Sequence, residues 1–118
     1  MKIEKLNDDQ LNYWVARAQG WHPEVLPVSR AWAWFDERDK FKFAITDYSP
    51  VNEWRHAGPL IDIYGVYLSS SDQPKNGGYY AHVGGLKPQG AYGFDAMQAI
   101  CRLVIRIALG DEVGEVEP

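Results

Sequence analysis

The chain has 118 residues, of which 46% are hydrophobic and 24% are charged, a length and composition typical of one compact globular domain. Lys and Arg together number 12 against 16 Asp and Glu, and four of these acids (Asp111, Glu112, Glu115 and Glu117) lie in the last eight residues. Residues 1–110 are therefore formally neutral, with 12 basic and 12 acidic side chains, which argues against a broad nucleic-acid-binding surface and against an acidic DNA mimic.

The first predicted element is a helix over residues 8–19. Asn7 is a good N-cap, and Gln10 three residues later can complete a capping box. Apolar residues then recur at helical spacing, and Gly20 follows as a stop signal.

A β-hairpin is predicted next. Prolines disfavour a regular element over residues 21–29. Residues 30–35 and 40–46 then alternate between apolar and polar side chains, which is typical of two strands joined by a short polar connection. A short helix starting at Ser29 is the alternative, because alanines and a charged run also suit a helix.

The central part of the chain is rich in turn and helix-start signals. Residues 51–57 can form one or two helical turns. Gly58 and Pro59 then favour a restart, since proline suits the first turn of a helix, and a second short helix over residues 60–64 ends at Gly65.

Two short strands and two glycine-containing connections follow. Residues 66–68 and 79–83 are predicted strands that pair with each other. Residues 69–78 predict an exposed loop, and residues 84–93 a second, glycine-rich connection.

The last predicted element is a helix over residues 94–109 with a wide apolar face. Arg102 and Arg106 mark its solvent-facing side, and Gly110 ends it. Acidic residues after that point lie at the negative end of the helix dipole and do not stabilise it. We therefore expect the tail, residues 111–118, to be a solubilising or contact extension rather than part of the fold.

These elements predict an α+β fold in which a small antiparallel sheet of about three to four strands packs against the N-terminal and C-terminal helices, with a short central helix. Residues 1–110 form the single predicted domain. The one cysteine, Cys101, excludes an intrachain disulfide and a cysteine-based zinc cluster. The N-terminus lacks an apolar signal segment and no stretch is long enough to span a bilayer, so we expect a soluble cytoplasmic protein without a membrane partner.

No motif predicts catalysis, a cofactor or a metal site. Gly85 and Gly90 have the spacing of a phosphate-binding loop, but Ala91 and Tyr92 stand where such a loop needs Lys and Ser or Thr. The histidines share no metal-ligand spacing; they are His22, His56 and His82. We therefore expect a non-enzymatic protein that needs neither a cofactor nor a metal.

Residues 48–61 form the candidate functional surface, because this stretch is irregular and mixes aromatic with polar side chains. The candidate binding residues are Tyr48, Trp54, Arg55 and His56. Aromatic and arginine side chains on loops dominate the binding energy of many interfaces. A purely structural role is the alternative, in which Trp54 fills the core and the neighbouring prolines set helix starts.

The same stretch resembles a known family. The motifs that carry the resemblance are Tyr48-Ser49-Pro50, Trp54, Gly58-Pro59-Leu60-Ile61 and Gly65-Val66. They are similar to the signature of a NinX-like family of small proteins from tailed phages and prophages. Residues 13–20 and 96–113 are similar to the opening and closing helices of that family, whereas residues 21–46 and 69–93 depart from its pattern. The resemblance implies a phage or prophage origin and action inside an infected bacterium, and it implies no catalytic residues.

Together these observations predict a phage accessory protein that binds a host or phage protein. The alternative is a small-ligand, nucleotide-like binder, because aromatic rings stack on bases and Arg55, His56 or residues 84–93 could contact phosphates. A homodimer could form through the exposed edge of the sheet or through spare helix surface.

Overall fold

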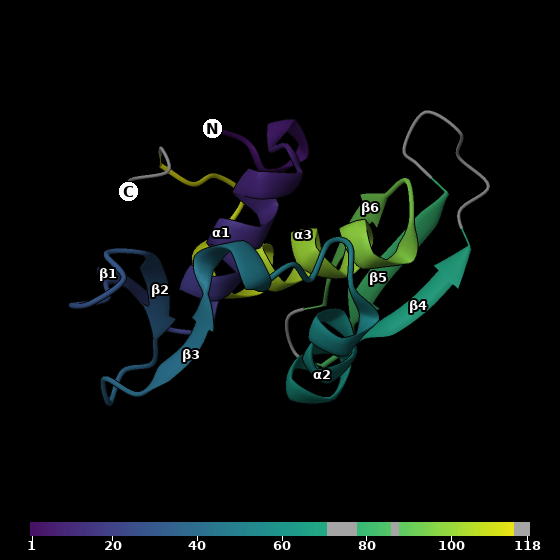
Figure 1. Ribbon diagram of the computed structural model, residues 1–118. Coiled ribbons are helices and arrows are strands. Elements are labelled where there is room, and N and C mark those ends of the chain that lie inside the picture. Colours follow the sequence, from purple (N-terminus) through teal and green to yellow (C-terminus); the bar gives the residue numbers. More distant parts are fainter. Residues whose placement is uncertain (71–77, 86–87, 115–118) are drawn as a thin grey trace.

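A computed structural model describes residues 1–70, 78–85 and 88–114 of the chain (Figure 1). The helices are α1 (Asp8–Ala18), α2 (Trp54–Tyr64) and α3 (Ala96–Leu109), with the 3-10 turns η1 (Ile3–Lys5) and η2 (Ile45–Asp47). The strands are β1 (His22–Val25), β2 (Trp32–Phe35), β3 (Phe41–Ala44), β4 (Tyr67–Ser70), β5 (Tyr79–Val83) and β6 (Gln89–Gly93). This content confirms the predicted α+β class.

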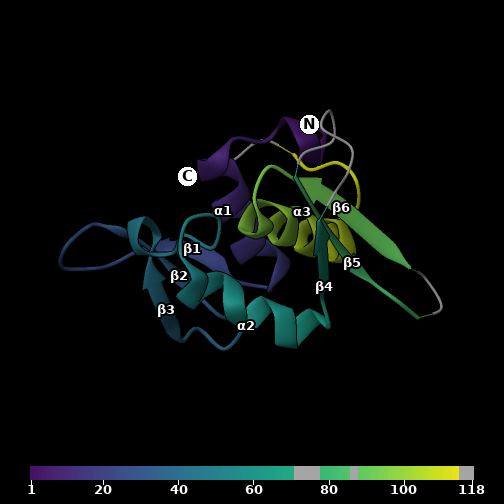
Figure 2. The same cartoon turned by 90° about the vertical axis from the view of Figure 1, so that its right-hand side faces the viewer.

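The described strands form two three-stranded antiparallel sheets, β1-β2-β3 and β4-β5-β6, rather than one small sheet. Helix α3 lies between them and packs against β5 and β6 as well as against α1 and α2 (Figures 1 and 2). Residues 99–105 of α3 are all buried, so this helix forms the centre of the core. The two sheets at opposite ends make the molecule elongated, with extents of 49 × 27 × 25 Å.

Helix α1 confirms the capping prediction. The Asn7 side chain accepts a hydrogen bond from the Gln10 backbone N–H, and the Gln10 side chain accepts one from the Asn7 N–H, both at 2.9 Å. Leu11 and Val15 are fully buried on the inner face of the helix. Its start is therefore fixed by local signals and its orientation by the apolar stripe.

The first sheet corrects the prediction that residues 21–29 are irregular. Strand β1 contains Pro23 and pairs with β2 along its whole length. Proline is tolerated there because an edge strand needs hydrogen bonds on one side only. Strands β2 and β3 form the predicted hairpin, so the alternative of a helix starting at Ser29 is wrong.

Helix α2 runs from Trp54 to Tyr64 without a break, so the prediction of two shorter helices separated at Gly58 is wrong. The missing N–H of Pro59 leaves the Arg55 carbonyl without its helical partner, but both residues are exposed and water can bind that carbonyl. Gly65 ends the helix as predicted, in the left-handed region with φ of +66°.

The second sheet confirms that the two predicted strands pair, as β4 and β5. It corrects the prediction of a glycine-rich connection over residues 84–93, because residues 89–93 form β6 beside β5. Gly93 has a packing role: a Cβ there would stand 2.4 Å from the Ala99 nitrogen, so only glycine lets β6 approach α3 this closely. Most of the predicted exposed loop, residues 71–77, lies outside the described residues.

The prediction that Arg102 faces solvent is wrong. Its guanidinium is buried and donates to the Tyr92 carbonyl at 2.9 Å and to the Glu4 carbonyl at 3.4 Å. Arg106 is only partly exposed; it donates to the Gly90 carbonyl and to the Glu4 carboxylate. These two arginines connect α3 to β6 and to η1. They therefore lie on a side of α3 that contacts other elements rather than solvent.

Residues 111–113 also belong to the fold, contrary to the prediction for the acidic tail. The Met1 ammonium group donates to the Val113 carbonyl at 2.7 Å, and the Val113 N–H donates back at 2.9 Å. The Asp111 carboxylate lies 2.8 Å from Nε of Arg106. The start of the tail therefore pairs with the N-terminal segment; residues 115–118 lie outside the described residues.

Candidate functional site

The four candidate binding residues do not share one surface. Tyr48 and His56 are buried, with 4% and 6% of their surface exposed, whereas Trp54 is 50% exposed. The Arg55 side chain is 71% exposed. Helix α2 begins at Trp54, so its first two residues point outward and His56 is the first to face the core. The candidate surface therefore divides into an inner cluster and an outer patch.

The inner cluster is built around the Tyr48 ring. Its centroid lies 4.9 Å from that of Trp21, 5.1 Å from that of Phe43 and 5.0 Å from that of His56. The Gln19 side chain donates to the Tyr48 hydroxyl at 2.7 Å. Burial raises the pKa of Tyr48 well above its ordinary value, so its hydroxyl stays protonated. This packing supports the structural role for Tyr48 and joins β3, α1 and α2.

His56 is held in its neutral form. Its Nδ1 accepts a hydrogen bond from the Ser49 backbone N–H at 3.0 Å, which requires Nδ1 to carry no proton. Burial lowers the pKa of His56. The carboxylate of Glu53 raises this pKa, whereas the positive charge of Arg55 lowers it. The imidazole is therefore a positioning group for residues 49–53 rather than a contact for phosphate.

The outer patch, which we call the Trp54 patch, consists of Glu53, Trp54, Arg55 and Gly58. Arg55 Nη2 lies 3.1 Å from a carboxylate oxygen of Glu53. Gly58 is one helical turn beyond Trp54, and apart from its own helix backbone no atom lies within 4 Å of the place where its Cβ would stand. The patch thus presents an indole, an ion pair and an open helix surface side by side.

A cleft of about 330 Å³ lies beside Tyr48, between α1 and the segment that follows β3. It is lined by Asp9, Asn12, Tyr13, Trp34, Ile45, Thr46, Tyr48, Ser49 and Asn52. Asn12 shapes its wall, because it donates to the Ser49 hydroxyl at 3.1 Å and accepts from the Val51 N–H at 3.1 Å. Among the described residues the lining holds a carboxylate and no Lys or Arg, so the cleft suits a neutral or cationic ligand better than a phosphate.

The histidines do not converge on one another. His22 lies on β1, His56 on α2 and His82 on β5. His82 stacks between two tyrosines of the second sheet, with ring centroids 5.7 Å from Tyr67 and 5.3 Å from Tyr80. Cys101 is buried in α3, and burial raises the pKa of its thiol, as expected of a cysteine that packs as a small hydrophobe.

Sequence reasoning missed an aromatic row on the outer face of the second sheet. Tyr80 pairs with Tyr92 across β5 and β6, and their ring centroids are 4.7 Å apart. Tyr67 on β4 is 65% exposed and extends the row. The alternation of Tyr80 and His82 predicts a strand. Tyr92 of β6, however, lies within residues 84–93, for which the sequence predicts a glycine-rich connection.

Comparison with known proteins identifies the family. A family model described as bacteriophage P22, NinX, matches residues 2–102 and so includes all four candidate residues and the lining of the cleft. This match confirms the resemblance noted in the sequence. No curated protein matches the chain. Within the described part of the chain, no helix has the length and apolar character needed to cross a membrane.

Proposed function

We propose that this chain, which belongs to the bacteriophage P22 NinX family, is a phage-encoded protein that binds a host or phage protein without catalysing a reaction. Its proposed place of action is the cytoplasm of the infected bacterium. A protein partner is favoured over nucleic acid because residues 1–110 carry equal numbers of acidic and basic side chains.

The exposure of Trp54 is the observation that carries this proposal. Half of its surface is accessible, although the same chain buries Trp34 to 1% exposure. Trp side chains bury roughly 150–250 Å² in full, so covering the free half would contribute about 2–3 kcal/mol to binding. Trp and Arg are also the residue types most enriched among interface residues that dominate affinity.

The surroundings of Trp54 fit an interface as well. Gly58, one helical turn beyond Trp54, has open space at the place of a Cβ, which a partner side chain can occupy. The ion pair between Arg55 and Glu53 lies at the rim, where charged groups favour specificity and rapid association. Apolar centre and charged rim together match the usual arrangement of a protein-binding surface.

The test is capture of partners from phage-infected bacteria with four forms of the protein: wild type, Trp54→Ala, Gly58→Arg and Phe94→Ala. Phe94 is the matched control, because it is 72% exposed and lies outside the Trp54 patch. We expect wild type and Phe94→Ala to recover the same partner, and both patch variants to lose it although they are fully folded at the temperature of the capture. Light scattering distinguishes a second copy of this chain from a different partner.

Recovery of the same partner by both patch variants would contradict the proposal. So would the absence of any partner after capture at several stages of infection. With a purified partner, calorimetry should show at least a tenfold loss of affinity for Trp54→Ala, which corresponds to about 1.4 kcal/mol.

A small-ligand binder is the second candidate, favoured by the cleft beside Tyr48. Its volume of about 330 Å³ lies at the lower end of the range of ligand pockets, roughly 300–1,000 Å³. Aromatic and amide side chains line it, a combination that suits a planar polar molecule such as a nucleobase or nucleoside. The carboxylate of Asp9 disfavours the phosphates of a nucleotide.

A thermal-shift screen of bases, nucleosides and nucleotides tests this candidate. A ligand at 100 times its Kd adds about 2.7 kcal/mol of stability. Asp9→Asn should change the response to a cationic ligand, whereas Asp8→Asn, a neighbour in the same helical turn that does not line the cleft, should not. No shift across the panel, or a shift by a cationic ligand that both variants preserve equally, would rule the cleft out.

A further inference from the structure

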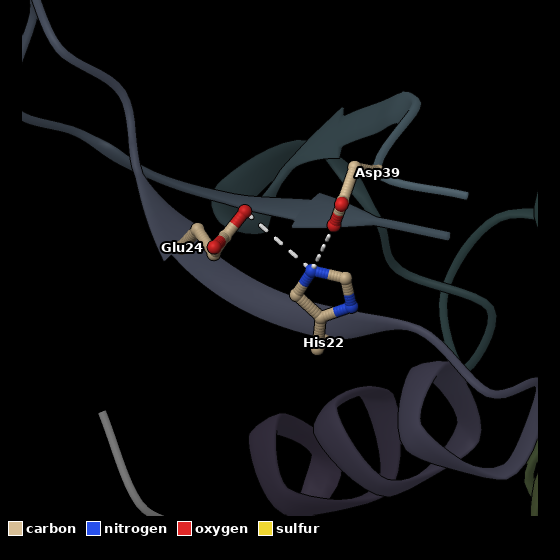
Figure 3. Close-up of side chains that lie close together, drawn as sticks. All are labelled: His22, Glu24 and Asp39. Atoms are coloured by element: carbon tan, nitrogen blue, oxygen red, sulfur yellow. Dashed lines mark ion pairs between the residues drawn. The ribbon is translucent and has the colours of Figure 1, made fainter. Parts of the chain in front are cut away.

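Three side chains outside the Trp54 patch and the cleft converge at the edge of the first sheet (Figure 3). Nε2 of His22 lies 3.5 Å from Oε2 of Glu24 and 3.1 Å from Oδ1 of Asp39. All three donor atoms lie within 4.8 Å of one another. Imidazole nitrogen and carboxylate oxygens are common ligands of divalent transition metals.

The fold brings these residues together from two segments. His22 and Glu24 are two positions apart on β1, so their side chains lie on the same face of the sheet. Asp39 comes from the turn between β2 and β3. His22 pairs with Phe35 at the end of β2, which places the start of β1 beside that turn.

Local contacts hold two of the three groups in place. The His22 ring stacks on Phe35, with centroids 6.2 Å apart and an interplanar angle of 23°. The Asp39 N–H donates to the Asp36 carbonyl at 2.9 Å, and the Asp36 carboxylate accepts from the N–H groups of Arg38 and Lys40. The imidazole and the Asp39 carboxylate are therefore positioned by packing and by the turn, not only by each other.

The charges of the cluster suit a cation. Nε2 of His22 carries at most one proton, yet two carboxylates approach it. Within the described residues, neither Glu24 nor Asp39 forms an ion pair with a lysine or arginine. The two carboxylates together supply the two negative charges that a divalent cation neutralises.

The two separations between the His22 nitrogen and the carboxylate oxygens fit zinc. Zn–N and Zn–O bonds of roughly 2.0–2.1 Å at tetrahedral angles place ligand atoms about 3.3–3.4 Å apart. The separations of 3.1 and 3.5 Å lie on either side of that value. We propose that His22, Glu24 and Asp39 bind a divalent transition metal ion, with Zn²⁺ as the best fit.

The site would have three protein ligands and an open fourth position. The His22 side chain is 33% exposed, that of Glu24 54% and that of Asp39 79%, so the fourth position faces solvent and takes a water molecule. The bound ion links β1 to the turn between β2 and β3. Because this arrangement exists only in the folded chain, metal binding stabilises the first sheet.

Calorimetric titration with Zn²⁺, and visible absorption with Co²⁺ as a spectroscopic probe, test the proposal. The variants are His22→Gln, Glu24→Gln and Asp39→Asn; asparagine tolerates the positive φ of 60° at position 39. The matched control is His82→Gln, which removes a histidine of the second sheet. We expect one ion per chain, at least a tenfold loss of affinity in each cluster variant and wild-type affinity in the control.

Two further results are expected of a site with an imidazole ligand. Zn²⁺ affinity should fall as pH is lowered, since the imidazole must lose its proton to bind, and Mg²⁺ at the same concentration should not displace Zn²⁺. In wild-type protein, zinc should shift the NMR signals of the His22 ring and leave those of His56 unchanged. This measurement needs no variant and so does not depend on how a variant folds.

Equal Zn²⁺ affinity of wild type and all three cluster variants would overturn the proposal. Displacement by equimolar Mg²⁺, or no saturable change in the His22 signals, would overturn it as well. The result is independent of partner binding, because the cluster and the Trp54 patch share no residue.

Discussion

Nδ1 of the buried His56 accepts a hydrogen bond from the backbone N–H of Ser49, at 3.0 Å. The bond ties the first turn of α2 to the segment that precedes it, and it exists only while Nδ1 is unprotonated. The exposed start of α2, including Trp54, is therefore held in place by a neutral histidine beneath it.

The first prediction concerns pH. Because burial lowers the pKa of His56 below the unfolded value of about 6.5, the unfolded chain binds this proton more readily than the folded one. The free energy of unfolding should consequently fall as pH drops below about 6.5, with a slope of up to about 1.4 kcal/mol per pH unit from this group until the folded imidazole titrates. Above about pH 6.5, His56 does not make the free energy of unfolding depend on pH. Chemical denaturation between pH 5 and 8 measures this free energy.

His56→Asn separates this effect from other titrating groups. The asparagine carbonyl can accept the Ser49 N–H in place of Nδ1, so the variant should fold yet show a shallower slope. Equal slopes for wild type and variant, or an NMR titration that places the pKa of His56 above 6.5, would contradict the argument.

Local signals in the sequence predicted elements whose ends are set by neighbouring residues. The capping box of Asn7 and Gln10 and the stop at Gly65 need only residues within the same turn, and both are present. The apolar periodicity of the first helix likewise predicts which of its faces is buried, whereas residues 99–105 of the last helix are buried on all sides. This much of an α+β fold can be deduced without knowing which elements pack together.

Features that depend on tertiary partners could not be predicted. Pro23 is tolerated because β1 happens to be an edge strand, and Pro59 because its side of α2 faces water. Gly90 and Gly93 are typical of turns, but here they allow Tyr80 and α3 to approach closely. Arg102 has the polarity of a surface residue, and only the position of β6 shows why it is buried.

The candidate site shows the same limit. The composition and irregular pattern of residues 48–61 predict a candidate surface, but the division into buried Tyr48 and exposed Trp54 depends on where α2 begins. The cluster of His22, Glu24 and Asp39 could not be predicted from the sequence. It brings together a turn and strand β1, and the prolines of residues 21–29 argue against a strand there.

The second prediction ranks two tryptophans. Trp34→Ala should lower the free energy of unfolding by about 3–5 kcal/mol, because it leaves a cavity beneath the first sheet. Trp54→Ala should cost less than about 1.5 kcal/mol, since half of the indole is already in water. Urea denaturation measures both. If Trp54→Ala lowered the free energy of unfolding as much as Trp34→Ala, the prediction would be contradicted and Trp54 would have a structural role.

The third prediction concerns the arginines of α3. Arg102→Lys should lower stability by about 1.5–3 kcal/mol, because an ammonium group cannot reach the carbonyls of both Tyr92 and Glu4. Glu4→Gln removes one of the two carboxylate partners of Arg106, at a half-exposed position, and should cost about 0–1 kcal/mol, less at high salt. Thermal unfolding at low and high salt compares them; a stronger salt dependence for Arg102→Lys would contradict its burial.

The fourth prediction ranks three glycines by what a methyl group would meet. Gly93→Ala places a Cβ 2.4 Å from the backbone nitrogen of Ala99, so the start of α3 must move and stability should fall by about 1–3 kcal/mol. At Gly90 the obstacle is the Tyr80 side chain, which can rotate, so Gly90→Ala should cost less. Gly58→Ala meets nothing within 4 Å and should gain up to about 1 kcal/mol from helix propensity. Equilibrium unfolding of the three variants measures this order, and a destabilising Gly58→Ala would mean that the surface beside Trp54 is not open.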